Sequence, residues 1–176
     1  TLLNEIFGAG GFTSRLMRAI RTDQGLAYST YGYISKGTDL GVFLMSAETQ
    51  AATTAKAAEL MQQEMRKMIA GPVSEEELQL AMDAEINRFV FPFESPAQVV
   101  SLQMDLDFFG YPQDWLSSYV YNLRQIGARQ VEDAARRFLH PEKMLLIVVG
   151  NMKQIQSDIQ RLGFGEPREI QLDPVE

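Results

Sequence analysis

The hydrophobic and polar positions divide the chain into two short segments with a period of two and a longer series with helical spacing. Alternation predicts strands over residues 26–34 and 40–47, joined by the turn-forming residues 35–39. Apolar stripes at helical spacing predict helices over residues 51–70, 74–89, 95–110, 114–125, 128–139 and 152–162. The continuous apolar run Met144–Val149 predicts a buried strand.

Cap signals fix where two of these helices begin. Ser74 and Glu77 have the spacing of a capping box, and Ser95 precedes a proline at the first helical position and a glutamine at Gln98. Strands, then helices, then a lone strand predict an α+β fold: a two-layer sandwich with a mainly antiparallel sheet and helices packed on one face. We expect a single domain over residues 1–163, followed by a tail over residues 164–176.

The segment from Phe12 to Tyr33 carries the candidate chemistry. Its pattern indicates a helix that ends near Gly25, because glycine favours the position just past a helix end, followed by a strand that begins near Tyr28. Arg21 would then lie on the last helical turn, where its guanidinium and the Tyr28 phenol could converge on one peptide carbonyl. The alternative is structural: Arg21 as a cation that favours the helix dipole, and Tyr28 as a half-buried strand aromatic.

The same segment is similar to a known family. The residues Gly8–Leu16 and Arg21–Tyr28, read as a Gly-rich turn, Ser-Arg-Leu and Arg-x-x-x-Gly-Leu-Ala-Tyr, resemble the insulinase-like zinc metallopeptidases, the family of pitrilysin and the mitochondrial processing peptidases. The resemblance is to the C-terminal, substrate-binding type of domain and covers roughly residues 1 to 155. It implies that the chain is the substrate-binding half of a zinc-dependent endopeptidase that hydrolyses unfolded peptides.

The resemblance also implies how the chemistry is divided. In that family Arg21 and Tyr28 would be the catalytic residues of this chain, binding the substrate backbone and stabilising the transition state opposite a zinc-bearing domain. The chain has no cysteine and one histidine, His140, so it cannot contain a His-x-x-Glu-His motif. We therefore expect no metal-binding and no cofactor-binding residues here, zinc only on another part of the parent enzyme, and no activity in the isolated chain.

Composition and charge limit the classes of partner that the chain could bind. The formal net charge of −7 argues against nucleic acid, and no apolar run approaches the roughly 20 residues that span a bilayer. The absence of cysteine fits the cytosol and an oxidising compartment equally, so the compartment stays open. The expected partners are a peptide substrate and an N-terminal zinc-bearing domain or subunit. The chain opens inside a predicted helix, which a strand normally precedes in the resembled family. The resemblance therefore implies a piece of a longer protein that lacks its first strand, and a second copy of the chain could cover the exposed sheet edge to form a homo-oligomer.

Two other functions stay open. The parent could be a catalytically inactive scaffold homologue within a larger complex. Alternatively, the turn Gly8–Gly11 could bind the phosphate of a small molecule, although no Lys-Ser/Thr follows it and the dinucleotide spacing is not met.

Overall fold

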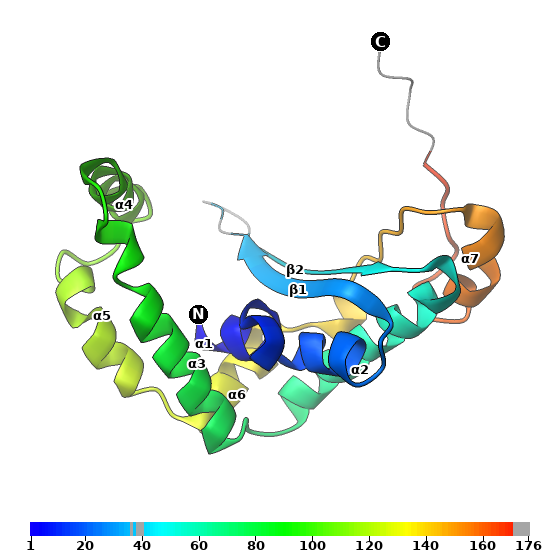
Figure 1. Cartoon of the computed structure of the whole chain (residues 1–176), viewed down its shortest axis with the longest axis horizontal. Helices are drawn as coiled ribbons and strands as arrows, with labels where there is room; N and C mark the ends of the chain where they lie inside the picture. The colour runs from blue at the N-terminus through cyan, green and yellow to red at the C-terminus, as the bar shows by residue number, and fades with distance from the viewer. Residues whose placement is uncertain (36, 38–40, 171–176) are drawn as a thin grey trace, which may run out of the picture.

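A computed structural model describes residues 1–35, 37 and 41–170. One β-hairpin lies over a layer of helices, and a second group of helices extends to one side as an arm (Figure 1). The α-helices are α1 Leu2–Asn4, α2 Thr54–Ala70, α3 Glu75–Arg88, α4 Pro96–Phe108, α5 Trp115–Arg124, α6 Ala128–Phe138 and α7 Met152–Gln160. The strands are β1 Ala27–Ser35 and β2 Val42–Thr49.

Short π- and 3₁₀-helical turns connect these elements. The π-helical turns are η1 Glu5–Ala9 and η3 Met17–Thr22, and the 3₁₀ turns are η2 Gly11–Thr13, η4 Ala51–Thr53, η5 Phe91–Phe93 and η6 Pro141–Lys143. The expected α+β fold, with an antiparallel sheet and helices on one sheet face, is confirmed. Within the described part of the chain no helix is both long and apolar enough to cross a bilayer.

The hairpin is antiparallel, with pairs running from Ala27 opposite Thr49 to Ser35 opposite Val42. Side chains alternate across a strand, so one face of β1 buries Thr30 and Gly32 while Tyr31 and Tyr33 face outward. The helices contact the buried face and share one core with it, in which Phe7, Leu16, Ile20 and Met68 have no exposed side-chain surface. The predicted turn at residues 35–39 falls mostly outside the described residues.

The Gly-rich turn packs closely against the backbone of β1 at Gly8. A Cβ on Gly8 of η1 would lie 2.5 Å from the backbone nitrogen of Gly32 and 2.7 Å from its Cα, far inside van der Waals contact. Gly11 adopts a left-handed φ of 57°, where a side chain would be strained. Packing and turn geometry therefore explain these glycines without a bound phosphate.

The prediction of a buried strand over Met144–Val149 is wrong. Residues 144–149 lie in neither a strand nor a helix, and the exposed fractions of Leu145, Ile147 and Val149 are 82%, 75% and 98%. Within the described residues, no strand lies beside this segment to pair with it. The apolar, β-branched residues of this run are typical of a strand. Whether the run is buried depends on a neighbouring strand, which its own composition does not specify.

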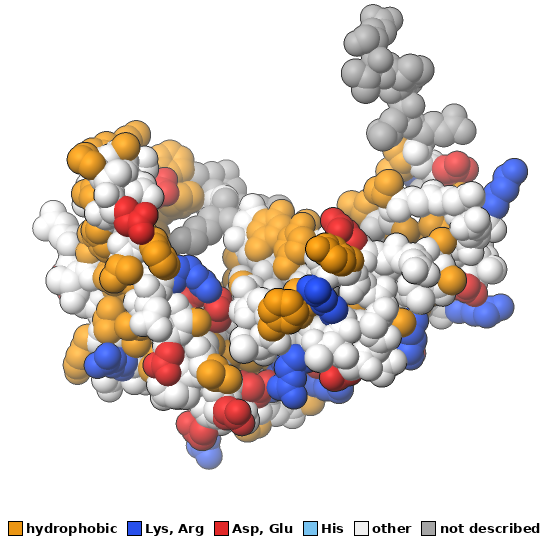
Figure 2. Space-filling view, viewed as in Figure 1, with side chains coloured by type: hydrophobic (Ala, Val, Ile, Leu, Met, Phe, Trp, Pro, Cys, Tyr) orange, Lys and Arg blue, Asp and Glu red, His pale blue; other side chains and the backbone are white. Residues whose placement is uncertain are grey.

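Within the arm of α3, α4 and α5, helix α4 is mostly exposed, whereas α3 contributes to the core. Figure 2 shows hydrophobic side chains along the α4 and α5 side of the molecule. On α4, Val100, Met104 and Phe108 are exposed and only Leu106 is buried. Residues 164–170 of the expected tail contain no helix or strand, and residues 171–176 lie outside the described part.

Candidate functional site

Arg21 and Tyr28 lie beside each other, as their positions in the sequence predict. Arg21 is in the last turn of η3, and Tyr28 is the second residue of β1. The connection between them is a glycine-terminated helix end: Gly25 has a φ of 62°, its N–H donates to the carbonyl of Arg21, and the Leu26 N–H donates to the carbonyl of Ile20. This local geometry reverses the direction of the chain, so that β1 starts next to the end of η3.

A cation–π stack defines the pair. The Arg21 Cζ atom lies 5.3 Å from the centroid of the Tyr28 ring and 4.9 Å from the centroid of the Phe12 ring. Both distances are within the range in which a guanidinium is attracted to an aromatic face, worth about 0.5–1 kcal/mol at an exposed site. The two rings therefore restrict the guanidinium while leaving its N–H groups available.

A strand irregularity presents Tyr28 to solvent. The register shifts between Ala27 and Ser29, so Tyr28 has no partner on β2 and forms a bulge. Bulges of this kind redirect one side chain and are common next to active sites. Tyr28 is 79% exposed, so it is not half-buried against the described residues.

Neither polar group is engaged elsewhere in the described structure. Among the described residues, neither the Tyr28 hydroxyl nor the Arg21 guanidinium makes a hydrogen bond or ion pair. Two adjacent, preoriented donors next to solvent can bind one acceptor group, such as a peptide carbonyl or the oxyanion that forms from it. Phe12, which is 67% exposed, completes the cluster and was not identified from the sequence. The available signal was a large aromatic residue inside a Gly-rich turn.

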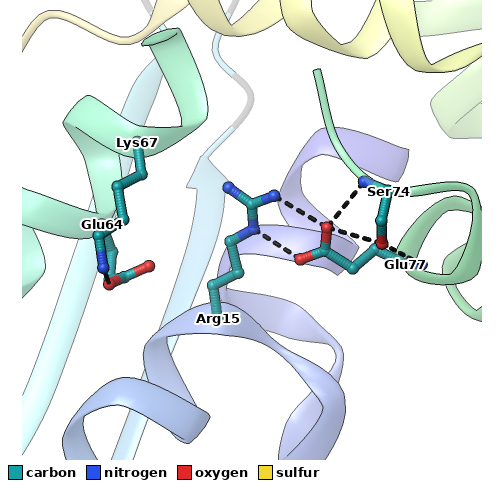
Figure 3. Close-up of polar contacts among 5 residues, drawn as sticks. All are labelled: Arg15, Glu64, Lys67, Ser74 and Glu77. Atoms are coloured by element: carbon teal, nitrogen blue, oxygen red, sulfur yellow. Dashed lines mark hydrogen bonds and ion pairs between the residues drawn. The ribbon is translucent and has the colours of Figure 1, made fainter. Parts of the chain in front are cut away.

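Arg15, the arginine of Ser-Arg-Leu, holds this region to α3 rather than facing a ligand. Its Nε donates to Glu77 Oε1 at 2.7 Å and its Nη2 donates to Glu77 Oε2 at 2.9 Å (Figure 3). Glu77 also accepts from the backbone N–H and the hydroxyl of Ser74, while the Ser74 hydroxyl accepts from the Glu77 N–H. The expected capping box is thus confirmed, and its glutamate has a second function as the partner of Arg15.

The ion pair between Arg15 and Glu77 makes stability depend on pH. The hydrogen bonds from Arg15 lower the pKa of Glu77 from 4.5 to about 2 against the opposing effect of burial. A carboxyl group whose pKa is depressed by folding stabilises the fold above its unfolded pKa, and this contribution is lost as the pH falls from about 5 towards 2.

Replacing Glu77 with glutamine should therefore lower the free energy of unfolding at pH 7 by about 2 kcal/mol, after allowance for solvent screening. The difference from wild type should shrink as the pH approaches 2, which urea denaturation between pH 7 and pH 2 would measure. Glu76→Gln, an exposed carboxylate in the same helical turn, is the matched control and should change stability by less than about 0.5 kcal/mol. Equal losses for both variants would contradict the assignment.

A second polar cluster connects the N-terminal turn to the arm. Arg88 donates to both carboxylate oxygens of Glu5, at 2.9 and 3.0 Å, and to Glu85 at 2.8 Å. Glu5 and Glu85 are only 4% and 8% exposed, and burial raises the pKa of Glu85. Tyr119 of α5 donates to Glu85 at 3.3 Å, and burial next to that carboxylate raises the pKa of Tyr119 to about 12. Because Glu5 and Glu85 share Arg88, this cluster holds the N-terminal turn against α3.

The donor groups of the described residues do not fit a zinc ion. No cluster of three or more His, Asp or Glu side chains that could hold a metal occurs among them. Glu5, Glu77 and Glu85 are already bound to arginines. His140 is on the surface, with Nδ1 3.5 Å from a Glu142 oxygen.

Comparison with known proteins agrees with the motif and the fold. Residues 1–85 match the family model described as the peptidase M16 inactive domain. An uncharacterised zinc protease of Bacillus subtilis, YmxG, is 24% identical over 153 residues, which is 86% of this chain and 37% of that protein.

Solved structures give the same result. The peptidase M16 inactive domain from Pseudomonas fluorescens superposes with a TM-score of 0.74 at 25% identity, over 81% of this chain and 34% of that one. A protease from Helicobacter pylori shares the fold, with a TM-score of 0.64 at 19% identity over 77% of this chain and 32% of that one. The chain thus spans only about a third of the length of these relatives. Together, the motif, the family model over residues 1–85 and the fold show that the chain resembles the C-terminal, inactive type of domain of the insulinase-like M16 peptidases.

Proposed function

We propose that this domain is the substrate-binding half of a zinc endopeptidase that cleaves unfolded peptides. The observation that carries the proposal is the exposed cluster in which Phe12 and Tyr28 hold the Arg21 guanidinium between their rings. Zinc, carried by another domain or subunit, supplies the metal chemistry. In the complete enzyme the cluster would face that metal site across the substrate.

In this proposal Arg21 and Tyr28 act on the carbonyl oxygen of the scissile peptide bond. The guanidinium and the phenol each donate a hydrogen bond to the oxygen, and these bonds strengthen as negative charge develops on it. Preoriented donors of this kind contribute about 3–4 kcal/mol each in a water-poor site. The cation–π stack reduces the reorganisation needed to align the guanidinium, because two rings already restrict it.

The scaffold alternative also has support. The matching family model describes an inactive domain, and one solved chain with this fold is part of Complex III2 from Candida albicans. That chain is 15% identical, so its likeness concerns the fold alone. A pure scaffold has no need of two exposed, unengaged donors beside each other, which favours the enzyme.

Cleavage of an unfolded peptide by the complete parent protein tests the proposal. The parent should cleave the peptide, lose activity with a zinc chelator and regain it when zinc is restored, while the 176-residue chain alone should be inactive. A complete parent that binds zinc without cleaving peptide, or that has no His-x-x-Glu-His motif, would leave the scaffold as the function.

A further inference from the structure

A buried cluster of carboxylates lies where the arm meets the N-terminal turn. Glu85 and Arg88 of α3 meet Glu5 of η1 and Tyr119 of α5 there, joined by hydrogen bonds of 2.8 to 3.3 Å. The proposed catalytic role uses none of these four residues. We propose that they form a proton-controlled latch, which holds α5 to α3 and to the N-terminal turn more firmly at mildly acidic pH than at neutral pH.

The two carboxylates of the latch share one guanidinium. Arg88 donates to both oxygens of Glu5, and its Nη1 also donates to Glu85 Oε1. When both carboxylates are ionised, the four side chains together carry one net negative charge, although both glutamates are buried. Net charge in a buried site is unfavourable, and two neighbouring carboxylates relieve it by binding one proton.

Protonation of Glu85 exchanges a repulsion for a hydrogen bond. Burial raises the pKa of Glu85, Arg88 opposes this effect and the neighbouring Glu5 adds to it. A protonated Glu85 can donate to Glu5, while its other oxygen still accepts from the Tyr119 hydroxyl. Tyr119, which is also hydrogen-bonded to Thr1, keeps its own proton because burial next to Glu85 raises its pKa to about 12.

Tyr119 connects helix α5 to the latch. Its ring stacks on Phe89 at the end of α3, with 4.6 Å between the ring centroids, and its hydroxyl reaches Glu85. Helices α3 and α5 lie side by side in the arm (Figure 1), and among residues 115–124 only Leu123 is buried. When α5 separates from α3, water reaches Glu85, and the pKa of its carboxyl group returns towards the ordinary value of 4.5.

The closed latch therefore binds the proton of Glu85 more tightly than the open latch does. By linkage, opening of α5 becomes more frequent as the pH rises above 4.5 towards neutral pH. The ion pair between Arg15 and Glu77 has the opposite sign and acts below about pH 5, so pH separates the two effects. The latch is independent of the proposed catalytic role, since it concerns the arm and is tested without turnover.

Hydrogen–deuterium exchange of the 176-residue chain at pH 5 and pH 7.5 tests the proposal. After correction for the intrinsic pH dependence of amide exchange, the protection of an amide reports how often its helix opens. Protection of residues 115–124 should be at least about threefold lower at pH 7.5 than at pH 5. Residues 54–70 of α2 should change less, because Met61, Met65 and Met68 anchor that helix in the core.

Two variants assign this response to the latch. Glu85→Gln cannot ionise, so protection of α5 should be the same at both pH values. Glu5→Gln removes the like charge and leaves Arg88 to Glu85 alone, so the response should fall to less than about half, and this variant decides alone if Glu85→Gln does not fold. Asp83→Asn is the matched control, because Asp83 is an exposed carboxylate on the same helix, and it should keep the wild-type response.

Three results would overturn the proposal. The first is equal protection of α5 at both pH values in the wild type. The second is an unchanged response in Glu85→Gln or Glu5→Gln, which would assign the titration to another group. The third is an equal change in α2 and α5, because the pH would then act on the stability of the whole domain rather than on the arm.

Discussion

Replacing Arg21 with alanine should lower kcat/KM of the complete peptidase for an unfolded peptide about 1000-fold. The substitution removes a charged donor to the scissile carbonyl, an interaction whose loss typically reduces rates by about 100- to 1000-fold. It also removes the group that stacks between Phe12 and Tyr28, so the remaining phenol is less restricted. Both effects act on the transition state, and kcat should fall more than KM rises.

Arg21→Lys is the variant that separates the two contributions. Lysine keeps the positive charge but has no planar group to stack on two rings, so we expect a loss of roughly 10- to 100-fold. Steady-state kinetics with one fluorogenic peptide would compare the three proteins. Arg18→Ala is the control, since Arg18 is an exposed arginine on the same helical turn and should retain near wild-type rates. Wild-type rates for Arg21→Ala would make Arg21 a helix-end cation only.

Replacing Gly8 with valine should destabilise the domain by about 3 kcal/mol. Any Cβ at Gly8 would meet the backbone of Gly32 at 2.5 Å, and a strand backbone cannot move aside as a flexible side chain can. Overpacking a tight interior site typically costs about 1–3 kcal/mol, and backbone contact puts this site at the upper end. A loss of this size is a large share of the stability of an ordinary domain, about 5–15 kcal/mol.

The matched control is Gly71→Val. Gly71 has an extended backbone with a φ of −172°, and a Cβ there would meet no atom within 4 Å. Urea denaturation should show a large shift of the midpoint for Gly8→Val and a shift of less than about 1 kcal/mol for Gly71→Val. A phosphate-binding role predicts a different result: Gly8→Val would fold normally and lose a phosphate ligand.

The structural features that could be predicted from the sequence are those determined by interactions between residues close together in the chain. The helix end at Gly25, the capping box of Ser74 and Glu77, and the cap at Ser95 depend on hydrogen bonds within six residues, and all three are present in the structure. The approach of Arg21 to Tyr28 belongs to the same class, because one turn determines it.

The features that were missed depend on distant partners. The partner of Arg15 is Glu77, 62 residues away along the chain, and this pairing depends on how the residues around Arg15 pack against α3. Phe12 reaches Arg21 because the Gly-rich turn folds back on the helix that follows it. The run Met144–Val149 was recognised as strand-forming, yet its burial depends on a neighbour that the described residues do not include.

The measurement that tests the central claim most directly is peptide cleavage by the complete peptidase, with Tyr28→Phe compared against Tyr31→Phe and zinc content determined for each. Tyr31 is a matched control because it is an exposed tyrosine on the same strand, stacked on Tyr33 and separate from the Arg21 cluster. The account predicts that Tyr28→Phe cleaves about 100-fold more slowly with full zinc content, because one hydroxyl donor is lost, while Tyr31→Phe is unchanged. Equal rates for the two variants would show that Tyr28 does not act on the substrate.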